Sequence, residues 1–198
     1  MILTTPLSEK VIRSLRAGDT VRLSGIIYTG RDEMHRRALE MHERGETLPV
    51  DLRDAAVFHC GPIVKKEGND WKVLAAGPTT SARMNGLEPK FIEVFGVRAI
   101  IGKGGMSRQT AEAMRRYGCV YLAFTGGAAV IAAKRIDRVV GVEWLDLGMP
   151  EALWVFEVKD FGPLIVGIDA NGESLYDEVD RRVKENLPAV RQSLGLKK

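Results

Sequence analysis

Four short segments of this sequence combine glycines with cationic or hydroxyl side chains: YTGRDEMH, AGPTTSARM, IGKGGMS and FTGGAA. Arginine can bind a carboxylate through two parallel N–H bonds, and lysine adds a compact positive charge. Two arginines and a lysine brought together would therefore form a clamp for a small anion. The candidate residues in these segments are Arg31, Asp32, His35, Thr79, Thr80, Ser81, Arg83, Lys103, Ser107, Thr125, Gly126 and Gly127.

Several of these residues also have a purely structural interpretation. Arg31 and Arg83 could pair with surface acids, and Asp32 could cap a helix. His35, one turn into that helix, is more often structural than a proton carrier. Lys103 is harder to explain as a solvated side chain, because the three glycines around it cost conformational entropy on folding.

Two other chemistries are disfavoured. The adjacent His59 and Cys60 suggest a thiol–imidazole pair, but neighbours in a strand point to opposite faces, so we expect no nucleophilic cysteine. IGKGGMS lacks the GxxxxGK[ST] spacing of a phosphate loop, which argues against a nucleotide-dependent enzyme.

Composition indicates an ordinary globular chain that we treat as one domain, residues 1–198. Apolar residues make up 45% and charged residues 28%, and the net charge is +3. Without a basic run we expect no nucleic-acid partner, and without a long apolar run we expect no membrane span. No signal peptide is visible, and two cysteines without a disulfide framework suggest a cytoplasmic protein. Two cysteines also cannot hold a cubane cluster, so we expect no metal site in this chain.

The elements that must position the four segments follow from hydrophobic periodicity and turn residues. Strand–helix alternation in the middle predicts a parallel sheet, and the strand-rich last third predicts a second, partly antiparallel layer. Ligands of such sheets bind beyond the carboxyl ends of the strands. Helices are predicted at 8–17, 32–44, 88–95, 107–117 and 175–187, and strands at 19–30, 55–62, 71–78, 97–102, 120–125, 136–144, 153–161 and 163–169.

The last predicted helix has apolar residues at helical spacing. We expect it to bury Val179, Val183 and Leu187. Pro188 is expected to end or break it.

Five stretches, taken in order, resemble the β subunit of class I iron–sulfur fumarate hydratase and of the similar L-tartrate dehydratase. They are TGRDEMH, GPTTSARM, GKGGMS, TGGAAV and GMPEALWVFEVKDFGPLIVGID, and they span about Leu7 to Asp169. The resemblance implies an α/β fold, a swivelling β/β/α three-layer domain with a mixed sheet.

The resemblance also implies a partner. It predicts a cysteine-rich α subunit that binds a 4Fe–4S cluster, which this chain does not bind itself. Because the chain begins at the β part, it is similar to the split rather than the fused arrangement, and an α2β2 assembly is a reasonable expectation.

By the same resemblance, Arg31, Arg83 and Lys103 are the substrate-binding residues and Thr79 is the catalytic residue. The implied reaction is reversible hydration of fumarate to L-malate. Dehydration of L-tartrate to oxaloacetate stays open, and so does a non-catalytic module that binds small anions.

Overall fold

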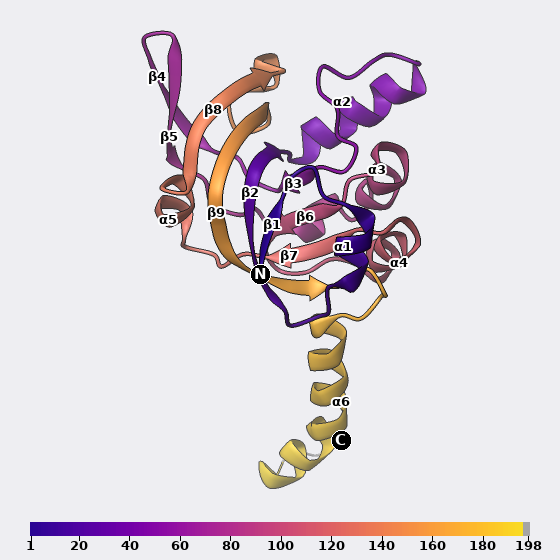
Figure 1. Cartoon of the computed structure of the whole chain (residues 1–198). Coiled ribbons are helices and arrows are strands. Elements are labelled where there is room, and N and C mark those ends of the chain that lie inside the picture. The colour runs from indigo at the N-terminus through magenta and orange to yellow at the C-terminus, as the bar shows by residue number, and fades with distance from the viewer. Residues whose placement is uncertain (196–198) are drawn as a thin grey trace.

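The computed structural model describes residues 1–195 as a β-rich body from which one long helix projects (Figure 1). The elements, in chain order, are β1 (Ile2–Thr4), α1 (Glu9–Ser14), β2 (Thr20–Thr29), α2 (Asp32–Glu43), β3 (Ala56–Phe58), β4 (Ile63–Glu67), β5 (Asp70–Ala75), the 3-10 helix η1 (Ser81–Met84), α3 (Glu88–Phe95), β6 (Ala99–Gly102), α4 (Arg108–Tyr117), β7 (Val120–Ala123), α5 (Ala129–Ala133), β8 (Ile136–Glu143), η2 (Leu145–Leu147), β9 (Leu153–Ile168) and α6 (Leu175–Ser193).

Local signals explain several boundaries. Ser8 and Ser107 cap α1 and α4, where each side chain accepts a hydrogen bond from the backbone N–H three residues later. Gly96 and Gly118 end α3 and α4 in the left-handed conformation. The predicted helices at these positions are confirmed, except that α1 already ends at Ser14.

The main sheet closes on itself. Its order is β1-β2-β3-β6-β7-β9-β8, and β9 pairs with β2 as well as with β7. Strands β2, β3, β6 and β7 run parallel, while β9 is antiparallel to both of its neighbours in the ring. The opposite walls of this ring are two β layers, and α2, α3 and α4 form a third layer outside (Figure 1). The predicted three-layer β/β/α arrangement with a mixed sheet is therefore confirmed.

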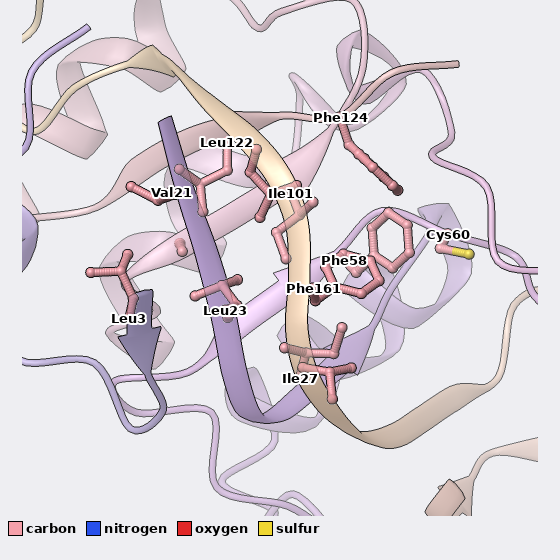
Figure 2. Packing of buried hydrophobic residues seen from close by; sticks show 14 of the residues in the cluster. Leu3, Val21, Leu23, Ile27, Phe58, Cys60, Ile101, Leu122, Phe124 and Phe161 are labelled. Atoms are coloured by element: carbon pink, nitrogen blue, oxygen red, sulfur yellow. The ribbon is translucent and has the colours of Figure 1, made fainter. Parts of the chain in front are cut away.

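Strand alternation separates two hydrophobic cores. Phe58, Ile101 and Leu122 point into the ring, where they meet Phe161 of β9 (Figure 2). The residues next to them, such as Val57 and Ile100, point outward and pack against the helices. One sheet thus supports both an interior core and the helical layer.

The predicted division of the last strand region into two strands was wrong. Segments 153–161 and 163–169 form the single strand β9, which bends where Asp160 and Gly162 adopt positive φ angles. Its antiparallel pairing was expected, and it closes the ring between β7 and β2. The strand predicted at 71–78 is confirmed as β5, which pairs with β4 in a separate hairpin.

The prediction for the last helix was also wrong. Helix α6 continues through Pro188 to Ser193, and Val179, Val183 and Leu187 are 59%, 56% and 45% exposed. The helix points away from the body (Figure 1), so no neighbouring element covers these side chains among residues 1–195. Solvent can also satisfy the backbone carbonyl that loses its partner at the proline. Every helix within residues 1–195 is too short or too polar to span a bilayer.

Candidate functional site

Three of the predicted loops lie at one edge of the ring. Arg31 follows β2, Lys103 follows β6, and Thr125 follows β7. These strands are parallel through β3, so their carboxyl ends share one edge. The fourth loop joins them because Thr80 forms a parallel bridge with Lys103. The structure thus brings all four predicted segments together.

Both arginines are paired with acids. Arg83 Nη2 lies 2.7 Å from Asp32 Oδ2, and Arg31 Nε lies 3.1 Å from Glu151 Oε1. Glu151 also accepts a hydrogen bond from the backbone N–H of Glu33 at 3.1 Å. A guanidinium carries five N–H groups, so each arginine can hold its acid and still donate to a bound carboxylate.

The prediction that Asp32 caps α2 was wrong. Asp32 is the first residue of α2 rather than its cap; Arg31 occupies the cap position without a capping hydrogen bond from its own side chain, and Glu151 accepts the backbone N–H of Glu33 in the first turn. The carboxylate of Asp32 pairs with Arg83 instead. Glu151 was not predicted as a site residue, because it comes from the loop before β9, some 120 residues from Arg31.

Lys103 is half-buried and makes no ion pair within residues 1–195. Its backbone carbonyl accepts a hydrogen bond from Ser81 N–H at 3.0 Å. The flanking glycines are required by close packing: a Cβ on Gly102 would lie 1.9 Å from Ser81 Oγ, and one on Gly105 would lie 2.9 Å from the ring of Tyr176. The glycines therefore hold the lysine loop against its neighbours and leave the ammonium group free.

Thr79 is half-buried, and its backbone N–H donates to the carbonyl of His59 at 2.6 Å. Its hydroxyl forms no hydrogen bond within the described part of the chain. A free hydroxyl is a weak base. Within residues 1–195 no side chain is hydrogen-bonded to this hydroxyl as an activating base.

Three fully buried ionisable side chains lie under these loops: His35, His59 and Glu88. His35 Nε2 and His59 Nε2 lie 3.4 Å and 3.0 Å from Glu88 Oε2. Burial opposes the charge on Glu88, but the two imidazoles outweigh it and lower the Glu88 pKa to about 2. Burial also disfavours charge on His35, yet Glu88 raises the His35 pKa above its usual value. Burial lowers the pKa of His59.

This cluster was not predicted. Its members are 24 and 29 residues apart along the chain (35 to 59, 59 to 88), and no sequence motif links them. His35 was expected to be structural, and His59 was given no role.

Cys60 is fully buried. It lies in the interior core (Figure 2), on the opposite side of the strand from His59, and burial raises the pKa of its thiol. The expected placement of His59 and Cys60 on opposite faces is confirmed.

Surface hollows occur elsewhere on the molecule. One of about 530 Å³ lies between α4 and α6, and one of about 670 Å³ lies beside the β4–β5 hairpin. Neither is lined by Arg31, Thr79, Arg83 or Lys103. The four-loop site is therefore distinct from both of these hollows.

Comparison with known proteins agrees with this geometry. A family described as Fumarase C-terminus matches residues 1–179. An Escherichia coli protein named L(+)-tartrate dehydratase subunit beta is 45% identical over 89% of this chain and 87% of its own length. A Methanocaldococcus jannaschii protein assigned by name to the same subunit is 48% identical over 91% of this chain and 93% of its own length. A Geobacillus stearothermophilus protein assigned by name to class I fumarate hydratases is 42% identical over 96% of this chain but only 36% of its own length.

Proposed function

Because this chain belongs to the fumarase C-terminal family, we propose that it is the β subunit of a two-subunit hydro-lyase that adds water reversibly to fumarate to give L-malate. The main support for this proposal is that the loops of Arg31, Arg83 and Lys103 lie together at one edge of the sheet. A dicarboxylate offers the charge and the planar oxygen pairs that such cations bind.

The chemistry explains why cations are needed there. Removing a proton from the carbon next to a carboxylate builds additional negative charge on that carboxylate. Donors fixed before the reaction stabilise this charge without having to reorganise. Arg31, Arg83 and Lys103 bind one carboxylate and stabilise its developing charge, and the Thr79 hydroxyl lies near the reacting carbon, where it transfers a proton or orients the substrate.

L-Tartrate is the second candidate substrate. The names of the Escherichia coli and Methanocaldococcus jannaschii relatives favour it. Its dehydration gives oxaloacetate, and the same cations would bind its carboxylate.

The iron–sulfur cluster of this enzyme class does not fit this chain. Its two cysteines, Cys60 and Cys119, are fully buried in different cores, and burial raises the pKa of both thiols. A cluster requires more thiolates than two separated, protonated thiols can provide. We propose that the cluster is bound by a cysteine-rich α subunit. Two free thiols also support a cytoplasmic location for the complex.

The direct test is reconstitution. The chain would be mixed anaerobically with the cysteine-rich α subunit, and fumarate absorbance would be followed with L-malate; oxaloacetate formation would be followed with L-tartrate. We expect activity only in the mixture, and the better substrate would identify the enzyme. A stable complex with an intact cluster but no turnover of either acid would overturn the proposal in favour of a binding module.

Helix α6 offers a docking surface for that α subunit. Its exposed apolar stripe consists of Val179, Val183, Leu187, Val190 and Leu194. The Geobacillus stearothermophilus relative supports this occupant, because its match covers most of α6 and lies within a chain that contains much additional sequence.

Placing a carboxylate in this stripe should weaken the complex. We expect Val183→Asp to reduce affinity for the α subunit by at least about tenfold, because a charge would be buried at an apolar contact. Titration calorimetry with the purified subunits measures this. Gln192→Asp, on the opposite face of the helix, is the matched control and should bind normally. If Val183→Asp binds the α subunit normally, the stripe is not the docking surface. If the substitution instead dissociates a homodimer of this chain, the stripe is a contact between two copies.

A further inference from the structure

The buried cluster of His35, His59 and Glu88 requires an explanation. All three side chains have no exposed surface, and apolar residues in their place would fill the same space. Replacing buried ion pairs by apolar groups is often neutral or stabilising. A need for packing alone therefore does not account for three ionisable groups here.

The contacts of His35 determine its charge. Its Nδ1 lies 2.8 Å from the backbone carbonyl of Arg31, and a carbonyl can only accept, so Nδ1 carries a proton. Its Nε2 faces Glu88 Oε2 at 3.4 Å. A second proton on that nitrogen makes an ion pair with the carboxylate, whereas a lone pair there would be repelled. His35 is therefore the imidazolium that pairs with Glu88.

The contacts of His59 make it neutral. Burial lowers the pKa of His59 and so favours the neutral ring. Ser81 Oγ accepts the Tyr121 hydroxyl proton at 3.1 Å and lies 2.9 Å from His59 Nδ1, to which it can donate its own proton. The remaining ring proton lies on His59 Nε2, 3.0 Å from Glu88. The cluster thus contains one positive and one negative charge. Glu88 also begins α3, where the helix dipole favours a carboxylate.

The ends of this network reach the three loops of the proposed site. His35 holds the backbone of Arg31, and the carbonyl of His59 accepts from Thr79 N–H at 2.6 Å. Ser81, bound to the His59 ring, donates its backbone N–H to Lys103 at 3.0 Å.

We propose that His35, Glu88 and His59 form a positioning network that fixes Arg31, Thr79 and Lys103 relative to one another. This inference rests on the proposed hydro-lyase function for its kinetic consequences, but not for its structural ones. The network touches no substrate and acts only through the loops that it holds. Its charge pair attracts α2 and α3 to each other electrostatically, which apolar packing would not do.

The test uses two matched substitutions on α3. Glu88→Gln keeps the size of the side chain and removes the buried charge, whereas Glu93→Gln makes the same change at an exposed position. In the reconstituted complex we expect Glu88→Gln to lower kcat/KM by about 10- to 100-fold, the effect of misplacing substrate-binding groups by roughly an ångström. Glu93→Gln should match the wild type.

A second variant covers the case in which Glu88→Gln fails to fold. Ser81→Ala removes the contacts of the Ser81 hydroxyl with His59 and Tyr121, keeps the backbone bond to Lys103, and leaves no buried charge unpaired. We expect a folded chain with about a tenfold loss of kcat/KM. Wild-type kinetics in both Ser81→Ala and a folded Glu88→Gln would overturn the proposal.

Hydrogen exchange of the full chain separates this proposal from the proposed function, because it needs no activity. The amides of Thr79 and Ser81 should exchange at least about tenfold faster in Glu88→Gln than in Glu93→Gln. Unchanged protection at both amides would overturn the network even if the enzyme is a hydro-lyase. If exchange is faster but the complex acts on neither acid, the positioning network is supported and the proposed hydro-lyase function is rejected.

Nitrogen-15 spectra of the histidines provide the last check. One buried imidazole should be doubly protonated, as the contacts of His35 with the Arg31 carbonyl and Glu88 require, in the direction of its raised pKa. The three side chains could also bind a metal ion, since their ligand atoms lie within 4.8 Å of one another. Two neutral buried rings, or stoichiometric metal in the purified protein, would overturn the charge-paired network.

Discussion

Replacing Lys103 by alanine in the reconstituted complex is expected to lower kcat/KM by roughly 30- to 5,000-fold. This corresponds to about 2–5 kcal/mol, the usual effect of truncating one partner of a desolvated charge pair. Lys103 is expected to be the most sensitive cation, because it has no acidic partner among residues 1–195, whereas Arg31 and Arg83 each have one. Its positive charge is therefore fully available to the substrate.

Steady-state kinetics with fumarate, L-malate and L-tartrate measure this effect. Lys90→Ala is the matched control, because Lys90 is exposed on α3 and pairs with Glu93 away from the site. Arg83→Ala should also lose activity, and it would leave Asp32 unpaired beside the substrate. If kcat/KM of Lys103→Ala stays within about threefold of the wild type, Lys103 does not bind the substrate.

The second large effect is expected at the centre of the ring. Phe58→Ala should reduce the free energy of unfolding by about 3–5 kcal/mol, because it leaves a cavity that the surrounding strands cannot fill. Phe58 is fully buried, and its ring lies 5.3 Å from Phe161 and 6.1 Å from Phe124, measured between centroids. These contacts join β3 to β9 across the interior (Figure 2).

Urea unfolding of the isolated chain measures the change. Val179→Ala on α6 serves as the control, since its side chain is 59% exposed and surface substitutions usually change stability by less than about 0.5 kcal/mol. A loss below about 1 kcal/mol for Phe58→Ala would show that the interior repacks easily. The described ring of strands would then be less tightly packed than its burial indicates.

Part of this protein could be predicted from its sequence because the relevant interactions are local. Ser107 caps α4 through a hydrogen bond within one helical turn, and Gly118 ends the same helix through its own backbone conformation. Strand alternation correctly placed His59 and Cys60 on opposite faces. The proposed site residues were also named from sequence, and parallel strands then bring their loops to one edge.

Other features depended on contacts between distant residues, which no local pattern encodes. The hydrophobic spacing of α6 predicts an apolar face, but only the fold determines whether a neighbour covers it. Likewise, β9 could be recognised as one strand only when its pairing with β2, β7 and β8 was known. The His35–Glu88–His59 cluster arises because α2, α3 and β3 pack together, and their burial converts three ordinary side chains into a coupled charge network.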